Sequence, residues 1–166
     1  MNIDEKYEDW NKWYIDHIIR VMKKVEPIEF SYKDMIYAIF EEEKEYLLKN
    51  NLSSYTHGDV SWNNVIANNN NIFLIDWDYV DIRHPWFDLA GTFEHLDDYG
   101  IFLDNLINEY FDENVPIDFY HVYKVFLCGQ VLEYLLYEKR KENGNIIYAL
   151  NKIKYVYDYV NRMEQK

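Results

Sequence analysis

Two short polar stretches near the middle of the chain combine residue types that can move a proton and hold a metal ion. The first covers residues 57–64 (His-Gly-Asp-Val-Ser-Trp-Asn-Asn) and the second covers residues 75–78 (Ile-Asp-Trp-Asp). A carboxylate such as that of Asp59 can accept or orient the proton of an attacking hydroxyl. The side-chain oxygens of Asn64 and Asp76 are of the kind that Mg²⁺ prefers. The two stretches therefore predict a magnesium-dependent site that acts on a hydroxyl group.

The spacing between these groups is the one found in kinase catalytic sites. In a kinase catalytic loop an Asp precedes an Asn by five residues, as Asp59 precedes Asn64, and a metal-binding Asp follows a later apolar strand, as Asp76 does. The alternative is that Asp59 caps a helix, Asn64 ends a turn and Asp76 begins a loop. Two motifs at the expected distance from each other favour the chemical interpretation.

A small β-hairpin is predicted to position the two stretches. Residues 65–67 and 72–75 are apolar and flank a polar Asn turn, while residues 53–56 are short and β-prone. The hairpin would fold Asn64 and Asp76 back toward each other. Helical periodicity predicts a mostly helical body around the hairpin, with helices over about 4–25, 31–50, 88–98, 101–111, 118–140 and 145–163. The first of these helices has an apolar stripe at spacings of three and four, formed by Trp10, Trp13, Tyr14, Ile18, Val21, Met22 and Val25.

Composition and charge narrow the class of protein. The 166 residues are 49% hydrophobic, which suits one folded domain and excludes wholesale disorder. Thirty acidic residues against 17 basic ones give a net charge of −13. That charge argues against a nucleic-acid or membrane partner and is compatible with a cationic small molecule. The single Cys128 excludes an intrachain disulfide. No secretory signal or membrane-length apolar run is visible, so we expect a cytoplasmic protein.

On these motifs the chain resembles the aminoglycoside phosphotransferase and choline kinase superfamily. The resemblance rests on residues 57–64, on residues 74–79 (Leu-Ile-Asp-Trp-Asp-Tyr) and on residues 85–90 (Pro-Trp-Phe-Asp-Leu-Ala). It is strongest from about Ser53 to His95. The second and third strings most resemble the bacterial choline and ethanolamine kinases, and spore-coat-associated and thiamine kinase-like members carry similar strings.

The resemblance implies a role for each polar residue of the two motifs. Asp59 would be the catalytic base, and His57 would hold the catalytic loop or serve as an ordinary structural histidine. Asn64 and Asp76 would be metal ligands, and Asp78 a second metal ligand or a substrate carboxylate. The implied reaction transfers the γ-phosphoryl group of ATP, with Mg²⁺, to the hydroxyl of a small molecule.

Other residues are implied in support and in substrate binding. Asp88 would brace the catalytic loop through backbone hydrogen bonds. An aromatic cage for a cationic substrate is one interpretation of several aromatic and acidic residues. A place in the core or at its rim is the commoner role for each of them. These candidates are Trp62, Trp77, Tyr79, Trp86, Glu133, Tyr134 and Tyr137.

The implied fold is the helical C-lobe of the protein-kinase-like phosphotransferases, mainly α with one hairpin. We expect a single domain over 1–166, with a lead-in to residue 50, catalytic loops over 53–90 and a helical substrate side over 91–166. All five glycines lie at or after Gly58. We therefore expect no N-lobe, since that lobe needs a glycine-rich loop and a strand-borne Lys.

A missing N-lobe leaves two hypotheses. The chain is a small-molecule kinase that a separate N-lobe chain or a homo-oligomer completes, as for a truncated or split gene product. The alternative is a non-catalytic binding module derived from the same family.

Overall fold

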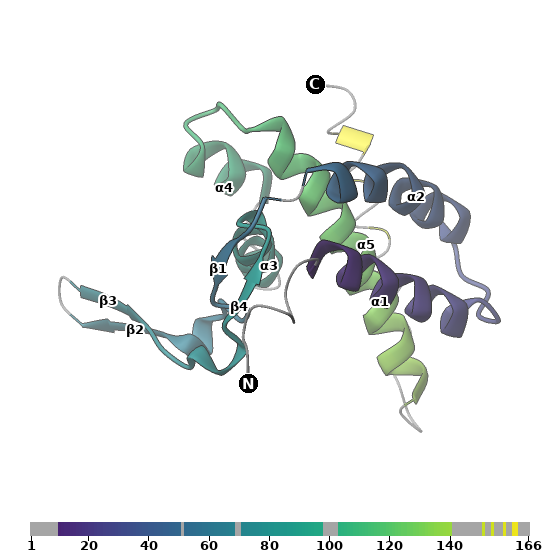
Figure 1. Ribbon diagram of the computed structural model, residues 1–166, viewed down its shortest axis with the longest axis horizontal. Helices are drawn as coiled ribbons and strands as arrows, with labels where there is room; N and C mark the ends of the chain where they lie inside the picture. The colour runs from purple at the N-terminus through teal and green to yellow at the C-terminus, as the bar shows by residue number, and fades with distance from the viewer. Residues whose placement is uncertain are drawn as a thin grey trace. The chain divides into compact units, whose positions relative to one another are not determined.

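The computed structural model describes residues 10–50, 52–68, 71–97 and 103–140, together with 151, 154, 158, 161 and 162. Over these residues the chain is mostly helical with small antiparallel ladders, which confirms the predicted fold class. It divides into two compact units, one of residues 1–11 and 50–123 and one of residues 12–49 and 124–166. The elements (Figure 1) are α1 (Trp10–Val25), α2 (Lys33–Lys49), β1 (Ser54–Thr56), β2 (Val65–Asn68), β3 (Asn71–Leu74), β4 (Asp81–Arg83), α3 (Trp86–Asp97), α4 (Leu103–Tyr110) and α5 (Ile117–Arg140).

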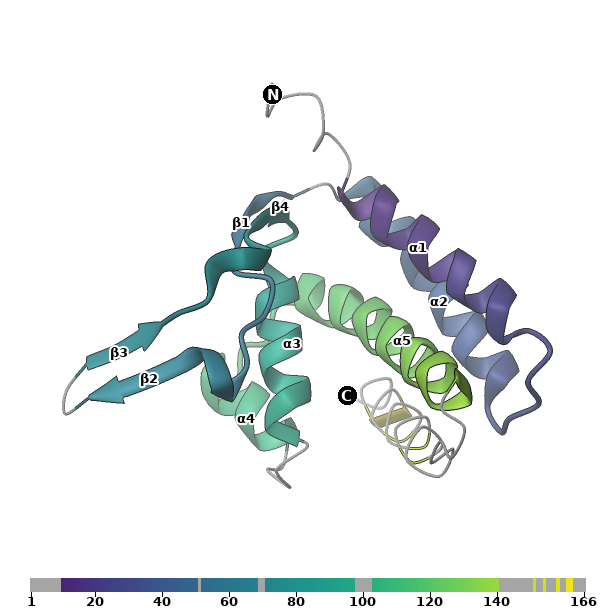
Figure 2. The same ribbon diagram turned by 90° about the horizontal axis from the view of Figure 1, so that it is seen from below.

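Helices α1, α2 and α5 supply most of the described residues in the unit of residues 12–49 and 124–166. Helices α1, α2 and the later part of α5 lie side by side in both views (Figures 1 and 2). Residues three and four apart share one face of a helix, so the apolar stripe predicted for α1 can be buried along its length. Trp13, predicted as part of that stripe, is instead 54% exposed. The buried apolar side chains described in this unit are Tyr14, Ile15, Ile18, Val21, Val25, Ile36, Ile39, Phe40, Leu47, Val125, Leu127, Cys128, Val131, Leu132 and Leu135.

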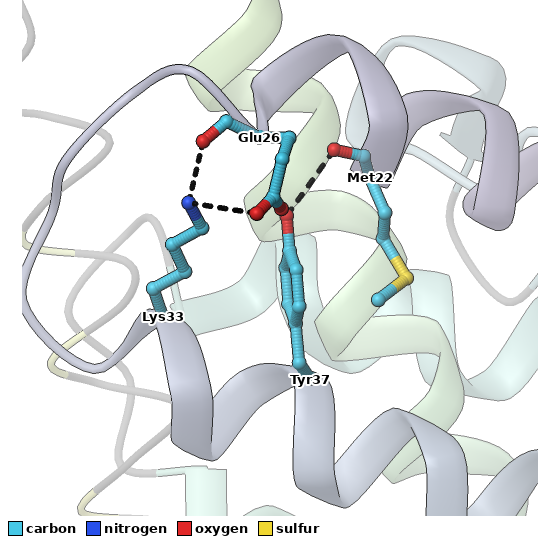
Figure 3. A network of polar contacts seen from close by, with 4 residues as sticks. All are labelled: Met22, Glu26, Lys33 and Tyr37. Carbon is cyan, nitrogen blue, oxygen red and sulfur yellow. Dashed lines mark hydrogen bonds and ion pairs between the residues drawn. The ribbon is translucent and has the colours of Figure 1, made fainter.

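Polar contacts hold the corner between α1 and α2 (Figure 3). The Tyr37 hydroxyl donates to the Met22 carbonyl at 3.2 Å, and the Lys33 ammonium donates to the Glu26 carbonyl. Burial, together with the neighbouring Glu26 carboxylate, raises the pKa of Tyr37 to about 12. The phenol therefore stays protonated at neutral pH and remains a donor. The Met22 carbonyl also accepts from the Glu26 amide at 2.9 Å, so Tyr37 is its second donor. The Lys33 bond satisfies the Glu26 carbonyl beyond the end of α1.

Helix α5 approaches the other two helices closely at Cys128 and Gly129. A methyl group on Gly129 would lie 2.5 Å from the Tyr14 hydroxyl, so any larger residue would displace that ring. The Cys128 thiol is fully buried and donates to the Ile36 carbonyl at 3.8 Å. Burial, with the neighbouring Glu43 carboxylate, raises the pKa of the thiol to about 12. The thiol is thus a packed core group.

Two antiparallel ladders characterise the other unit. Val65 of β2 pairs with Leu74 of β3 in the predicted hairpin, which extends away from α3 in both views (Figures 1 and 2). Tyr55 of β1 pairs with Ile82 of β4. The sequence predicted β1, but not its partner, because three residues are too few to show an alternating pattern.

Aromatic rings fill the core of this unit. Phe119, at the start of α5, is fully buried and has edge-on contacts with Trp86 at 6.0 Å and Phe93 at 5.9 Å between ring centres. Trp10 lies edge-on to Phe87 at 4.4 Å. Each such pair contributes roughly 0.5–1.5 kcal/mol beyond the burial of its area. Several of the chain's many aromatic residues are therefore used to pack this core.

The predicted helices agree with the structure wherever it is described. The predicted segments 88–98, 101–111 and 118–140 correspond to α3, α4 and α5 within two residues at their described ends. Residues 4–9 of the first predicted helix lie outside the described residues, as does most of the predicted helix 145–163. Among the described helices, none has both the length and the apolar character needed to cross a membrane.

Candidate functional site

The loop between β1 and β2 turns sharply at Gly58. Its φ is +87°, in the left-handed region that a residue with a Cβ rarely adopts. His57 before it is 2% exposed, while Asp59 after it is partly exposed. A 3₁₀ turn, Trp62–Asn64, then leads directly into β2. The sequence places a buried imidazole and an accessible carboxylate on either side of one glycine.

The Asn64 amide is fixed by Asp59. Its Nδ2 donates to the Asp59 carbonyl at 2.9 Å and to Asp59 Oδ2 at 3.0 Å. These two acceptors use both amide hydrogens, so Oδ1 is the atom left to accept. The opposite orientation of the amide would set its oxygen against two other oxygens. Asn64 therefore presents an oxygen, the ligand atom that a hard cation requires.

The hairpin brings the second polar stretch beside the first. The Ile75 amide donates to the Asn64 carbonyl at 2.9 Å, so the residue before Asp76 lies directly across from Asn64. Asp76 has a φ of 62° and begins a second 3₁₀ turn, Trp77–Tyr79, which carries Asp78. Both carboxylates are exposed, and neither accepts a hydrogen bond from a residue within the described ranges. Their oxygens are available to a ligand.

The buried His57 side chain is hydrogen-bonded to both polar stretches. Its Nε2 donates to the Ile75 carbonyl at 2.8 Å, and its Nδ1 accepts from the Asp59 amide at 3.3 Å. A carbonyl can only accept, so these bonds assign the neutral tautomer protonated at Nε2. The Trp77 ring packs edge-on against the imidazole at 4.6 Å between ring centres. Both ring nitrogens are engaged, which leaves His57 no lone pair with which to act as a base.

Asp88, in the first turn of α3, binds the backbone of the catalytic loop. Its Oδ2 accepts from the His57 amide at 2.6 Å and its Oδ1 from the Gly58 amide at 2.9 Å. One carboxylate thus satisfies two consecutive N–H groups of a sharp turn. Hydrogen bonds to a charged acceptor contribute about 1.5–3 kcal/mol each.

Replacing Asp88 with Asn is expected to lower the free energy of unfolding by about 2 kcal/mol. The amide keeps one acceptor oxygen but sets an NH₂ group against the second backbone N–H. Urea denaturation of the Asp88→Asn variant measures the change. Asp34→Asn is the matched control because Asp34 also lies in a first helical turn and is exposed. An equal loss in both variants would show that helix-end charge, and not the loop, explains the effect.

His84 is a buried histidine between β4 and α3. It is 1% exposed, and its Nδ1 accepts from the Trp86 amide at 3.4 Å. Its Nε2 has no hydrogen-bond partner in the part of the chain that the structure describes. Burial lowers the pKa of His84 below its usual 6.5, and the nearby Asp118 carboxylate opposes part of that shift.

The lowered pKa of His84 predicts a loss of stability on mild acidification. The unfolded chain takes up a proton near pH 6.5 and the folded chain only at lower pH. The stability that neutral His84 contributes is therefore complete above pH 6.5. It is lost as the pH falls through the lower pKa that His84 has in the folded chain. One such group changes the free energy of unfolding by at most about 1.4 kcal/mol per pH unit. Denaturation at pH 7.5 and 5.5 should show a smaller pH effect for His84→Gln than for the wild type. Equal pH effects would contradict the prediction.

The residues predicted to bind substrate lie in separate parts of the structure. Trp77 and Tyr79 are exposed beside Asp78, whereas the Trp86 ring lies in the aromatic core. Glu133 and Tyr134 belong to the unit of residues 12–49 and 124–166, where Glu133 accepts a hydrogen bond from His17 Nε2 at 2.5 Å. Trp62, like Trp77, is about half exposed.

The donor set beside the hairpin fits a hard cation better than a transition metal. No group of three or more His, Cys, Asp or Glu side chains forms a metal cage within the described residues. Asn64 and Asp76 offer one amide oxygen and one carboxylate. Mg²⁺ is usually bound in this way, through one or two carboxylates with waters and substrate phosphates completing its shell. The residues present therefore fit Mg²⁺ held jointly with a phosphate-bearing ligand.

Sequence reasoning missed the contacts of Arg83. Its Nη2 donates to the Tyr79 carbonyl at 3.0 Å, and its guanidinium carbon lies 5.5 Å from the centre of the Trp10 ring. These partners come from separate parts of the chain, and no local spacing signals their contact. The sequence signal is only that Arg83 is a basic residue between the motif of residues 74–79 and the motif of residues 85–90.

Comparison with known proteins bears on the whole site. The family model described as the phosphotransferase enzyme family matches residues 4–120. This span is well over half of the chain, and it includes helices α1 and α2 as well as both polar loops. No curated protein and no solved structure is significantly similar to the chain.

Proposed function

The chain belongs to the phosphotransferase enzyme family, and on this premise we propose that it transfers the γ-phosphoryl group of ATP to the hydroxyl of a small molecule. The observation that carries the proposal is the double hydrogen bond from the Asn64 amide to Asp59. It supports the assignment of adjacent roles to a proton acceptor and a metal-binding oxygen. The reaction is proposed to take place in the cytoplasm, in keeping with a single free Cys128.

Asp59 is the proposed catalytic base. Its Oδ2 accepts from Asn64, while its Oδ1 takes no hydrogen bond from a residue that the structure describes. The free oxygen would accept the hydroxyl proton as that hydroxyl oxygen bonds to the γ-phosphorus. The bond from the γ-phosphorus to the bridging oxygen breaks, and the diphosphate of ADP takes the electron pair. A base in this role acts at about 2.6–3.2 Å from the hydroxyl oxygen.

Asn64 Oδ1 and the Asp76 carboxylate are the proposed Mg²⁺ ligands, and Asp78 is a second carboxylate for metal or substrate. When bound, Mg²⁺ neutralises the phosphate oxygens and the negative charge that develops on the leaving group. His57 and Asp88 take no part in the chemistry. They hold the backbone on which Asp59 is mounted, through four hydrogen bonds within 3.3 Å.

The proposed substrate is an alcohol that carries a cationic group, such as choline or ethanolamine. The exposed rings of Trp77 and Tyr79 flank Asp78 in one short turn. Aromatic faces and a carboxylate are the groups that bind an ammonium ion. The net charge of −13 favours the approach of a cation.

A second candidate function is a non-catalytic or split-kinase module that works with another chain. Between residues 10 and 50, the described elements are helices, with no strand to carry a phosphate-binding Lys. The β2–β3 hairpin also exposes Ile72 (79%), Phe73 (52%) and Ile66 (49%). Exposed apolar residues of this kind favour a covering partner. Under this proposal the catalytic residues remain, but a separate N-lobe chain or a second copy supplies the grip on the nucleotide.

The experiment is to incubate the purified chain with ATP, Mg²⁺ and a panel of choline, ethanolamine, thiamine and aminoglycosides. Phosphorylated product that disappears with EDTA and returns with added Mg²⁺ would support the enzyme. Absence of both turnover and Mg²⁺–nucleotide binding by calorimetry would overturn the stand-alone enzyme and favour the second candidate. Sedimentation of the same sample distinguishes the versions of that candidate, because self-association at high concentration points to a second copy.

A further inference from the structure

The Arg83 side chain, on β4, contacts both polar loops of the site. Its Nη2 donates to the carbonyl of Tyr79, which ends the turn that carries the two exposed carboxylates. Its second contact is with Gly58. A methyl group on Gly58 would lie 2.1 Å from Arg83 Nη1 and 3.0 Å from the guanidinium carbon. The guanidinium therefore lies directly against the Gly58 backbone, in the loop that carries the proposed base.

Two further contacts help to set the position of the guanidinium, although one of its nitrogens has no hydrogen-bond partner among the described residues. Strand β4 pairs with β1, where Arg83 lies opposite Ser54, so the backbone below the side chain is held in a ladder. The Trp10 ring lies 5.5 Å from the guanidinium carbon, within the range of a cation–π contact. Its Nε is buried and has no hydrogen-bond partner among the residues that are described. Such an unmet donor is costly, so full hydrogen bonding does not explain why Arg83 lies here.

We propose that Arg83 is a positioning residue that sets the separation between the loop of Asp59 and the turn of Asp76 and Asp78. This inference rests on the proposed function, because it assigns the metal to that turn. The planar guanidinium suits the role, since it bonds a carbonyl at its edge while it packs against a glycine and an aromatic ring. Lysine, a flexible point charge, cannot make both contacts.

Charge and positioning predict opposite effects on metal affinity. Arg83 carries a positive charge close to the proposed cation site, because it bonds to Tyr79, the residue after Asp78. By charge alone, removing it should strengthen the binding of a cation. If Arg83 instead holds the two loops at the correct distance, removing it should weaken binding. Loss of supporting groups around a metal site commonly lowers affinity by about 10–100-fold.

The test measures Mn²⁺ binding to the full chain by electron paramagnetic resonance, with Mn²⁺ in place of Mg²⁺. We expect Arg83→Met to bind Mn²⁺ about 10-fold more weakly than the wild type, and Arg83→Lys to show an intermediate loss. Arg20→Met is the matched control, because Arg20 is exposed on α1 and its loss removes the same charge. Unchanged or tighter binding in folded Arg83→Met would overturn the inference.

A second measurement does not depend on metal. Hydrogen exchange followed by NMR reports on the His57 and Gly58 amides, which donate to Asp88. In Arg83→Met both amides should exchange about 10-fold faster, with no change in Arg20→Met. Unchanged exchange overturns the inference. If the wild type binds no Mn²⁺, the proposed metal site fails and the exchange result alone decides the role of Arg83. If Arg83→Met does not fold, Arg83→Lys is measured in both experiments. Unchanged Mn²⁺ binding or unchanged amide exchange in Arg83→Lys would then overturn the inference.

Discussion

The Asp59→Asn variant should transfer phosphoryl groups about 10²–10⁴-fold more slowly than the wild type, the usual contribution of general acid–base catalysis. Asparagine keeps an oxygen that can accept the hydrogen bond from Asn64 Nδ2, now 3.0 Å from Asp59 Oδ2. The loop can therefore retain its shape while the side chain loses its ability to take a proton. The measurement is the initial rate of product formation at saturating ATP and Mg²⁺.

The control for this variant is Asp16→Asn, because Asp16 is exposed on α1 and its loss changes the net charge equally. Its rate should stay within twofold of the wild type. Mn²⁺ affinity should change little in Asp59→Asn, since the proposed ligands Asn64 and Asp76 remain. A variant that keeps more than a tenth of the wild-type rate would show that Asp59 is not the base.

The Gly58→Ala variant is expected to lose about 3–5 kcal/mol of unfolding free energy, and with it the geometry of the site. A residue with a Cβ is strained at the φ of +87°. The added methyl group would also lie 2.5 Å from the Tyr79 carbonyl and 2.1 Å from Arg83 Nη1. The end of the Arg83 side chain can move aside, but the contact with the Tyr79 carbonyl cannot be relieved in that way. The carbonyl belongs to the backbone, which cannot move away without shifting the turn of Asp78.

Thermal and urea denaturation measure this loss directly. Asn63→Ala serves as the control within the same loop, because Asn63 is exposed. It should change the free energy of unfolding by less than about 0.5 kcal/mol. A Gly58→Ala protein as stable as this control would mean that the loop can rearrange freely, which would also weaken the case for Arg83 as a spacer.

Local patterns predicted the elements but not all of their pairings. The hairpin followed from two apolar runs around an Asn turn. It was expected to fold Asn64 and Asp76 toward each other, and Ile75, the residue before Asp76, donates to the Asn64 carbonyl. Strand β4 and its ladder with β1 were not predicted, because a three-residue strand carries no periodic signal. Trp13 was assigned to a buried stripe and is exposed instead. Periodicity defines a face but not how far neighbouring helices cover its edge.

The candidate site divides in the same way. Residue types and spacing were enough to select Asp59, Asn64 and Asp76, since their chemistry is local to two short loops. The contact of Arg83 with Gly58 and with the Trp10 ring depends on three distant segments. Pairwise spacing in a single sequence contains no information about such contacts. The roles of Glu133 and Tyr134 stay predictions for the same reason.

The buried thiol of Cys128 has a practical consequence for labelling. It is the single cysteine of the chain, and its pKa of about 12 keeps it protonated at neutral pH. A thiol that is both shielded and protonated reacts slowly with alkylating dyes. A cysteine introduced on the hairpin, for example at Ile72, would therefore be the reactive one without removal of the native residue. Conversely, Cys128 itself can react only when the unit of residues 12–49 and 124–166 opens. The rate of its modification would therefore measure how often that unit opens.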